Sequence, residues 1–360
     1  MSPKLTIAGR PVGAGFSPYV IAEMSANHNG SIETAMRIIA AAKQAGAQAV
    51  KLQVYRPDTI TIDAESDEFR IEGGLWSGRT LYDLYEEAHT PWVWIPELVK
   101  HAEKHAITIF GSVFDMSSVD FMEDSKTPAY KIASFEAIDL PLIKYAASTG
   151  KPLIISTGMA DADEIAEAIQ AAKDGGCSQL AILHCVSAYP AKAEHYNLST
   201  MVDMATRYGV VTGLSDHTLS NITSIASVAL GASIIEKHFT LDRDGGGPDD
   251  SFSLEPSDLE QLCRDSKYAW EALGKVDYGR QSSEIENQKF RRSLYVVKDL
   301  CAGERVTAEH VKSIRPGFGL APKFIDRIIG SVAKIDMVRG AAVKLENFEI
   351  VSKAASKYEQ

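Results

Sequence analysis

The chain has 360 residues, of which 45% are hydrophobic and 24% charged, and this composition suits a globular protein with one large core and a smaller second domain. Its formal net charge of −11 argues against a nucleic-acid surface and against adhesion to anionic membranes, which both need clustered positive charge. No stretch has the length and hydrophobicity of a signal peptide or a membrane span, and the cysteines form no CxxC pair. We therefore expect a reduced, cytoplasmic protein without a nucleic-acid or membrane partner.

Short apolar runs alternate along the chain with segments of helical periodicity. Residues 31–46 and 162–176 each carry an apolar stripe and end near glycine, as helices do. Eight strand–helix units in about 250 residues favour a closed (β/α)8 TIM barrel. An open doubly wound sheet is the alternative, but the first strand leads into SANHNG and not into a glycine-rich phosphate loop. The expected strands are 19–26, 49–55, 107–114, 129–134, 153–158, 180–186, 210–216 and 232–239.

The pattern changes near residue 278 and divides the chain into two domains and a connection. Residues 1–278 form the expected barrel, the polar stretch 279–290 is predicted to be a linker, and 291–360 has the short strands and glycine turns of a small β-rich domain. This domain is too small for a deep active site, so we expect it to cover the mouth of its own or a partner's barrel. The long, tryptophan-rich connection 67–94 is expected to be a lid or an oligomer contact.

Polar side chains end nearly all of the expected strands, where TIM-barrel enzymes place their active sites. Lys51 and Lys131 lie inside strands, and a buried lysine needs an anionic partner, which is either a structural carboxylate or a substrate. Four strand-end serines beside two lysines suggest a cradle for an anion with several oxygens, although a single such serine indicates only a turn. Glu23 is the expected general acid or base, kept ionised by the lysines and a metal, or else their counter-ion, and Glu236 is a second candidate catalytic residue. The remaining substrate-binding candidates at strand ends are Tyr55, Ser112, Ser134, Ser156, Ser187, Tyr189 and Ser215.

Two successive strands end in related motifs, GLSDHTLS at 213–220 and SIIEKHFT at 233–240. They place His217 and His238 at matching positions near the mouth. Two neutral imidazoles at such a separation can share one divalent ion and leave positions for water or a substrate oxygen. Two independent, hydrogen-bonded histidines are the alternative reading. A two-histidine set suits Mn²⁺ better than structural zinc, which needs four protein ligands, and Mg²⁺ and Co²⁺ are further candidates.

Motifs along nearly the whole chain resemble the sialic acid synthase family, also called the nonulosonic acid synthases. The resemblance implies a barrel followed by an antifreeze-like (SAF) domain, a domain-swapped homodimer, and the condensation of phosphoenolpyruvate with an amino sugar and water, with phosphate released by C–O cleavage. The barrel motifs are IAEMSANHNG, KLQVYRPDTIT, YKIASFE, IISTGM, HCVSAYP, GLSDHT, EKHFTLDR and GPDDSFSLEP, and those resembling the SAF domain are RRSLYVVKDLCAGERVT and IRPGFGL.

The same resemblance implies roles for individual residues. It implies that His217 and His238 hold a divalent metal, usually manganese, and that Glu23 is the acid closest to the reacting centre. Sugar contacts are implied for Tyr189 and Asp249, and for Arg315 of the partner subunit. The residues that match the family's contacts to phosphoenolpyruvate are Lys51, Ser112, Lys131, Ser134, Ser156, Ser187 and Ser215.

Three stretches, SANHN, LWSGRTLYDLYEEAHTPW and YKIASFE, resemble one branch of the family in particular. Synthases of legionaminic acid or N-acetylneuraminic acid differ at these places and are the alternatives with the same chemistry, because a few contacts decide the sugar. A metal-dependent aldolase that uses pyruvate and a non-catalytic sugar sensor on the same fold are alternatives of other classes. The complete set of candidate residues favours a synthase, because a sensor has no need of both an anion cradle and a metal.

Overall fold

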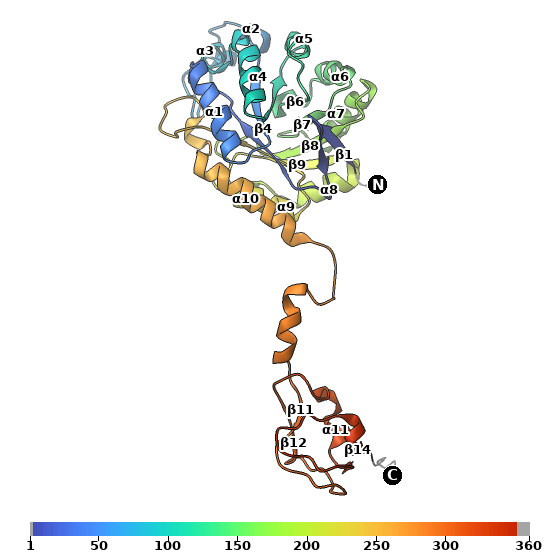
Figure 1. The fold of residues 1–360 in the computed structure, drawn as a ribbon. Coiled ribbons are helices and arrows are strands. Elements are labelled where there is room, and N and C mark those ends of the chain that lie inside the picture. The colour runs from blue at the N-terminus through green and yellow to red at the C-terminus, as the bar shows by residue number, and fades with distance from the viewer. Residues whose placement is uncertain (1–2, 351–360) are drawn as a thin grey trace. The chain divides into compact units, whose positions relative to one another are not determined.

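The computed structural model describes residues 3–350. Within this range, eight parallel strands close into a barrel, and each lies inside the run that the sequence predicts for it (Figure 1). The strands follow one another around the barrel in chain order, and the last one pairs with the first. The barrel strands are β3 (Tyr19–Glu23), β4 (Ala49–Val54), β5 (Thr108–Val113), β6 (Tyr130–Ile132), β7 (Leu153–Ser156), β8 (Leu180–Cys185), β9 (Val211–Asp216) and β10 (Ile234–His238).

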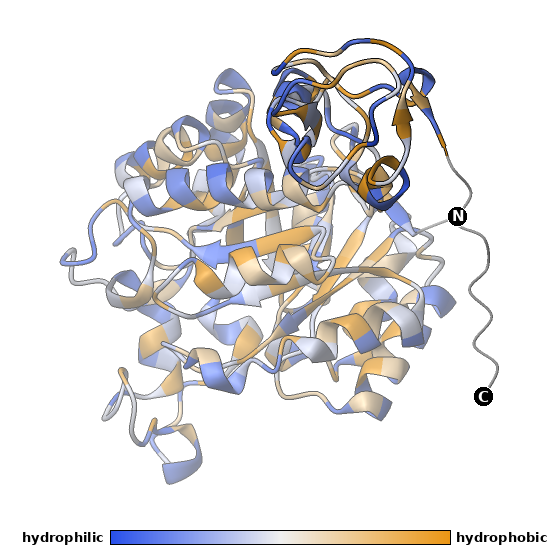
Figure 2. Ribbon diagram, turned by 90° about the horizontal axis from the view of Figure 1, so that it is seen from below, coloured by the Kyte–Doolittle hydropathy of each residue, from blue (hydrophilic) through white to orange (hydrophobic). Residues whose placement is uncertain are grey.

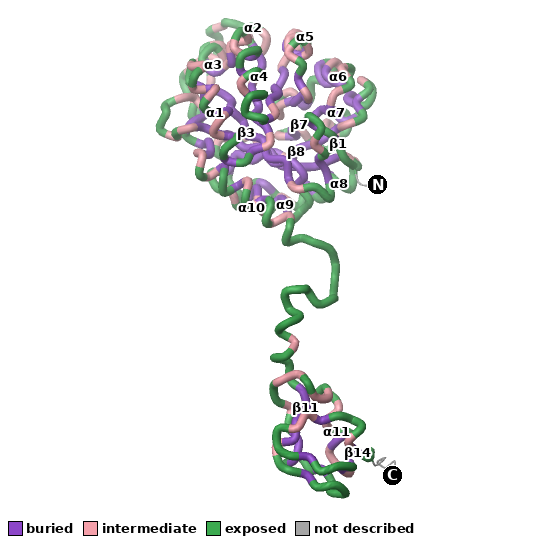
Figure 3. The backbone as a smooth tube through the Cα atoms, in the orientation of Figure 1, coloured by how far each residue is buried: buried purple, intermediate pink, exposed green. Residues whose placement is uncertain are grey.

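Helices surround the barrel and bury one face each against it, as the burial pattern in Figure 3 shows. Their starts are encoded locally: Ser31 accepts a hydrogen bond from the N–H of Thr34, and Asp161 and Glu164 form a capping box. No helix in residues 3–350 is both long and apolar enough to cross a membrane. The helices are α1 (Ile32–Gln44), α4 (Ile95–Lys104), α5 (Met116–Asp124), α6 (Leu140–Ser148), α7 (Ala162–Asp174), α8 (Ser199–Tyr208), α9 (Ile222–Ala229) and α10 (Pro256–Leu273).

The inside of the barrel is filled with apolar side chains at the end where the strands begin. A hairpin of β1 (Lys4–Ile7) and β2 (Arg10–Gly13), which the sequence reading did not anticipate, contributes to this packing. Figure 2 shows hydrophobic residues along the barrel strands. This apolar floor leaves only the other end of the barrel for polar chemistry. Its members are Leu5, Ile7, Val12, Tyr19, Ile21, Ala49, Phe110, Ala129, Ile154, Ala181, Leu183, Val211 and Ile234.

The long connection between β4 and β5 folds into short helices rather than an open loop. Its α3 helix begins after Thr80, whose side chain accepts a hydrogen bond from the N–H of Asp83. Trp76 donates its indole N–H to the carbonyl of Pro248, 3.0 Å away, in the loop that follows β10. The connection is therefore anchored at the mouth of its own barrel. Its elements are α2 (Pro57–Ile60), η1 (Asp67–Phe69), α3 (Leu81–Ala88) and η2 (Trp92–Trp94).

The chain divides into two compact units after Gly274, at the end of α10. The sequence places this boundary at residue 278, and the stretch 279–290 that it predicts to be a linker contains the 3-10 helix η6 (Ser282–Phe290) of the second unit. The second unit has short strands and its own apolar core, which includes Leu294, Val311 and Phe348. Its other elements are β11 (Ser293–Val296), β12 (Val311–Ile314), α11 (Ile325–Ile328), β13 (Val332–Ala333) and β14 (Phe348–Glu349).

Candidate active site at the barrel mouth

A polar pocket lies inside the barrel at the ends of the strands. Because side chains alternate along a strand, the inward residue two positions beyond each floor residue reaches this level. On β3, Tyr19 and Ile21 belong to the floor and Glu23 lines the pocket. Most of the site residues predicted from the sequence are brought together here: Glu23, Lys51, Ser112, Lys131, Ser134, Ser156, Tyr189, Ser215, His217, Glu236 and His238.

Two carboxylates and two lysines form a buried cluster at the base of the pocket. The Nζ atom of Lys51 lies 2.5 Å from Oε2 of Glu23 and 3.5 Å from Oε1 of Glu236, and it donates a hydrogen bond to Ser112 at 2.8 Å. Lys131 lies 3.7 Å from the same oxygen of Glu236. Each charge is thereby partly compensated inside the protein, which is the condition for burying it.

The cluster gives its two carboxylates opposite protonation behaviour. Burial raises the pKa of Glu23 to about 7 although Lys51 opposes the shift, and the neighbouring charge of Glu236 raises it further. Burial also acts on Glu236, but Lys131 and Lys51 outweigh it and hold the pKa of that carboxyl below its ordinary value. The sequence reading expects lysines and a metal to keep Glu23 ionised. Within the protein itself, burial outweighs the lysines and brings the pKa of this carboxyl close to neutral pH, where it can exchange a proton.

Several polar atoms in this part of the barrel are buried without a hydrogen-bond partner. They include Oγ of Ser156, Oε2 of Glu236 and Nδ1 of His238. Buried polar atoms in folded proteins normally have partners, so such a group facing a pocket is suited to a ligand. Nearby, Ser134 and Ser187 are hydrogen-bonded to each other at 2.8 Å. Cationic and hydroxyl donors are thus gathered around one pocket, as an anion with several oxygens would need.

The two histidine rings lie edge to face at the rim, with centroids 5.4 Å apart. The Nδ1 of His217 lies 2.8 Å from the carbonyl of Val186, which can only accept, so the neutral ring carries its proton there and its Nε2 keeps a free lone pair. Burial, together with the neighbouring His217, holds the pKa of His238 well below its ordinary value. Burial lowers the pKa of His217, but the neighbouring Cys185 outweighs it and raises this pKa, so a metal would compete with a proton for the ring. In their neutral forms the two imidazoles fit a divalent ion that keeps open coordination positions.

Protein ligands alone do not complete such a site. Within the described chain, no group of three or more histidine, cysteine, aspartate or glutamate side chains is placed to hold a metal. The nearest acid is Asp249, whose Oδ2 lies 3.9 Å from Nδ1 of His238. The donor set therefore fits the open, two-histidine site that the sequence predicts and does not fit closed structural zinc.

Aromatic side chains line the rim of the pocket next to the two histidines. The Tyr189 ring lies 4.4 Å from the His217 ring and 5.9 Å from the His238 ring, measured between centroids. The ring of Trp76, in the long connection, lies 5.8 Å from the Tyr189 ring. The connection thus contributes to the wall of the mouth, which gives it a location that the sequence could not specify.

Four predicted residues do not line the pocket in the barrel unit. Tyr55 is buried between the rings of Tyr85 and Phe114, and Ser187 supports Ser134. Asp249 is buried and accepts a hydrogen bond from Ser25. Arg315 belongs to the second unit, where it follows β12.

The structure also adds residues that the sequence reading left out or interpreted differently. Cys185, read as an ordinary buried thiol, lines the pocket, because it is the next inward residue after Leu183 on β8. Ser25 donates its backbone N–H to Oε1 of Glu23 at 3.0 Å and accepts from Gln53 at 2.7 Å, so it holds the carboxylate in place. The strand period could have indicated Cys185, but no sequence signal indicates Ser25.

Comparison with known proteins assigns this barrel with its C-terminal unit to a class. The model of the NeuB family matches residues 38–278, and that of the SAF domain matches 291–349. The chain belongs to the NeuB family, which the sequence motifs predict.

Individual relatives show which members of the family the chain is similar to. The chain is 40% identical to a pseudaminic acid synthase of Campylobacter jejuni over 92% of its own length and 96% of the relative. It is 33% identical to an N,N'-diacetyllegionaminic acid synthase of Legionella pneumophila, over 94% and 97%. The solved N-acetylneuraminic acid synthetase of Leptospira borgpetersenii, a complex with citrate, superposes with a TM-score of 0.71 at 30% identity and covers 80% of this chain and 95% of that one.

Proposed function

We propose that this protein is a pseudaminic acid synthase. It condenses phosphoenolpyruvate with 2,4-diacetamido-2,4,6-trideoxy-L-altrose and water and releases pseudaminic acid and phosphate. One observation supports this proposal most strongly: two buried lysines, two buried carboxylates and two neighbouring histidines line the same pocket. The choice of sugar is supported by 40% identity to a pseudaminic acid synthase, against 33% to a legionaminic acid synthase.

The lysines and serines bind the anionic substrate in this proposal. Lys51, Lys131 and the strand-end serines take the carboxylate and phosphate oxygens of phosphoenolpyruvate. Glu236 holds the two ammonium groups near each other, because its Oε1 lies 3.5 Å from Nζ of Lys51 and 3.7 Å from Nζ of Lys131. Donors held in advance around developing negative charge stabilise a transition state by about 3 kcal/mol each.

The reaction joins C3 of phosphoenolpyruvate to the aldehyde carbon of the open-chain sugar, whose oxygen gains a proton. Positive charge then develops at C2, and water adds there and loses a proton, which gives a tetrahedral hemiketal phosphate. Phosphate departs by cleavage of its C–O bond to C2 and takes up the proton of the remaining hydroxyl group, which leaves a 2-keto acid. Glu23 would accept the proton of the water, because it lines the pocket and its pKa of about 7 lets it exchange protons at neutral pH.

His217 and His238 would hold the divalent ion, for which we propose Mn²⁺, with Mg²⁺ and Co²⁺ as alternatives. When bound, such an ion supplies Lewis-acid polarisation of a carbonyl oxygen. The hydrogen bond from Nδ1 of His217 to the Val186 carbonyl orients the ring, and Tyr189 packs beside it. The aromatic rim of Tyr189 and Trp76 is placed to take the apolar parts of the sugar.

A second copy of the chain completes the site in this proposal. The segments that follow β5, β6 and β7 at the mouth expose Met116, Phe135, Ile138 and Met159, which are available for contact with a partner. We propose a domain-swapped homodimer in which the SAF unit of one subunit covers the mouth of the other and supplies Arg315 to the sugar. The four free cysteines support a reducing, cytoplasmic location.

Phosphate release from phosphoenolpyruvate tests the function directly. Metal-stripped protein would be assayed with and without Mn²⁺, and with the altrose sugar beside the legionaminic precursor and N-acetylmannosamine. We expect release only with the altrose sugar and only with metal, and its loss in His217→Ala. Release with another sugar would support the proposed reaction but assign it a different sugar substrate. No release from folded, Mn²⁺-supplied protein with any of the sugars would refute a synthase.

A further inference from the structure

A charged pair interrupts the apolar outer row of the barrel next to the two histidines. On β10, Ile235 faces outward into the core between barrel and helices, as does Phe239 directly after the strand, and Lys237 lies between them in the same row. Its register partner on β9 is Asp216. Both side chains are almost fully buried, and Nζ of Lys237 lies 3.0 Å from Oδ2 of Asp216. Each is the residue immediately before one of the histidines.

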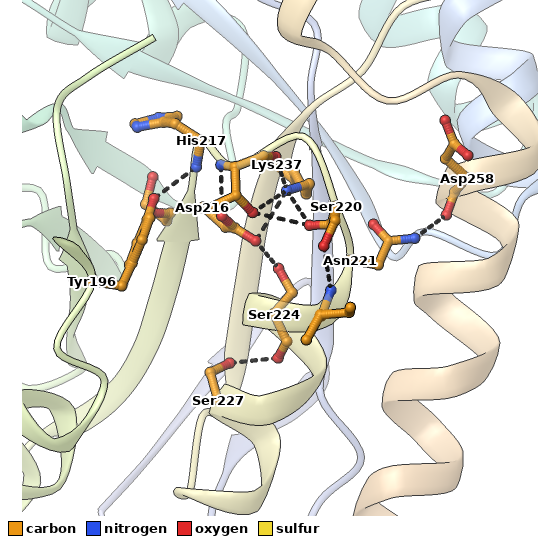
Figure 4. A network of polar contacts seen from close by, with 12 residues as sticks. Tyr196, Asp216, His217, Ser220, Asn221, Ser224, Ser227, Lys237 and Asp258 are labelled. Atoms are coloured by element: carbon orange, nitrogen blue, oxygen red, sulfur yellow. Dashed lines mark hydrogen bonds and ion pairs between the residues drawn. The ribbon is translucent and has the colours of Figure 1, made fainter. Parts of the chain in front are cut away.

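The pair binds the backbone that follows His217 (Figure 4). Asp216 accepts the N–H of Thr218 at 2.8 Å. Lys237 donates to the carbonyl of Thr218 and to that of Ser220, the latter at 3.1 Å. The turn after His217 is therefore held through both its N–H and its carbonyl groups by charges that β9 and β10 themselves carry.

Further hydrogen bonds connect this turn to the surrounding helices. Asp216 also accepts from the hydroxyl of Ser224 in α9 at 2.6 Å, and Asn221 donates to the carbonyl of Asp258 in α10 at 2.8 Å. On the opposite side, the N–H of His217 donates to the hydroxyl of Tyr196 at 2.7 Å. Every one of these contacts restricts the main chain on which the His217 ring is mounted.

Stability alone does not account for charges at these positions. Burying an ion pair is expensive, and packed apolar residues of similar size usually serve a protein's stability equally well or better. Most outer positions of the barrel wall are apolar, for example Val50 and Leu52 of β4, and a polar one such as His184 of β8 binds a main-chain carbonyl without forming an ion pair. What an apolar pair could not do is bind the carbonyl groups and the N–H of the 218–220 turn.

We infer that the Lys237–Asp216 pair is a positioning device that sets the spacing of the two imidazoles. It ties β9 to β10 one residue before each histidine and fixes the turn after the first. The inference rests on the proposed metal site at His217 and His238. Partners behind metal ligands typically change metal affinity by about 10–100-fold when they are removed.

Binding of Mn²⁺ to the metal-stripped, full-length protein without substrates tests this inference. Free Mn²⁺ would be measured by electron paramagnetic resonance during titration, and thermal unfolding would be recorded for each variant. The variants are Lys237→Met, the double change Asp216→Leu with Lys237→Met, and His217→Ala. Lys151→Met is the matched control, because it removes a lysine that pairs with Glu123 at 2.7 Å, away from the mouth.

We expect Lys237→Met to raise the Kd for Mn²⁺ about 10–100-fold. The double variant should regain thermal stability relative to Lys237→Met, because no buried charge is left unpaired, yet still bind Mn²⁺ weakly. If Lys237→Met does not fold, the double variant carries the test. Wild-type affinity in the double variant would make the pair purely structural and overturn the inference. If His217→Ala binds Mn²⁺ as tightly as the wild type does, the metal does not bind at the histidines. That result would overturn the proposed metal site together with the inference.

Discussion

The two ends of the barrel interior are built by the same strands and have opposite character. At the floor, inward positions such as Ile21, Phe110 and Ile154 form a closed apolar layer. Two residues further along each strand, Glu23, Ser112 and Ser156 face the pocket. One strand period, about 7 Å of chain, separates a hydrocarbon core from a cluster of buried charges.

This difference separates stability from function within one structure. The floor buries apolar surface and contributes to folding, whereas the pocket concentrates lysines and carboxylates whose burial opposes folding. A dry floor also keeps water from reaching the cluster from below, which strengthens its electrostatic interactions. Substitutions at the two ends should therefore change different measurable quantities.

The largest effect is expected from Glu23→Gln at the pocket end. Removing the proton acceptor while keeping its shape should lower kcat about 10²–10⁴-fold and leave the KM for phosphoenolpyruvate within a few-fold. Steady-state phosphate release measures both constants. Glu136→Gln is the matched control, because burial raises the pKa of this carboxyl to about 7 as well, but it does not line the pocket. Nearly unchanged turnover in Glu23→Gln would remove this carboxylate from the mechanism.

At the floor, Phe110→Ala should lower the stability of the protein. A fully buried phenylalanine replaced by alanine leaves a cavity, which lowers the free energy of unfolding by about 3–5 kcal/mol. Denaturant unfolding followed by tryptophan fluorescence measures this loss. The fraction that remains folded should keep both KM values, because the floor does not contact substrate. A changed KM with intact stability would show that the two layers are not separable.

Arg315→Ala tests whether the pocket end is complete within one chain. Loss of a bidentate guanidinium contact should raise the KM for the sugar about 10–100-fold and that for phosphoenolpyruvate far less. Mixing this variant with Glu23→Gln under subunit exchange should restore activity, because one mouth of a swapped heterodimer would have both Glu23 and Arg315. No recovery after verified exchange would place Arg315 over its own barrel or outside the site.

The pH dependence follows from the raised pKa of Glu23. If the carboxylate accepts a proton, kcat/KM should fall about tenfold per pH unit below a midpoint near 7, because only the ionised form reacts. The charged groups that face it are Lys51, Lys131 and Glu236. The acid limb should disappear in Glu23→Gln, and its persistence there would assign the titration to another group.

The smallest effect is expected at the rim, from Trp76→Leu. The variant loses the hydrogen bond to Pro248 and the packing on Tyr189, which together should raise the KM for the sugar about 2–10-fold. Trp92→Leu serves as the control, since this residue of the same connection stacks on Phe121 instead. Equal changes in both variants would indicate that the connection only stabilises the fold.

The fold was largely predictable because periodic burial is written into the sequence. All eight barrel strands lie inside their predicted runs, since a strand covered on both faces is apolar over most of its length. The hairpin β1–β2 escaped notice, because four-residue strands carry little pattern. The domain boundary differs by a few residues, because the polar stretch after Gly274 has the composition of a linker whether or not it contains the 3-10 helix η6.

The sequence by itself determined which residues could meet at the mouth, because parallel strands that close into a barrel end at one rim. Glu23, Lys51, Lys131 and the two histidines were identified in this way. Only the tertiary structure decided how they interact: that Lys51 pairs with Glu23, and that burial raises the pKa of Glu23 to about 7. Distances and desolvation depend on the three-dimensional environment, and no local pattern of residues encodes them.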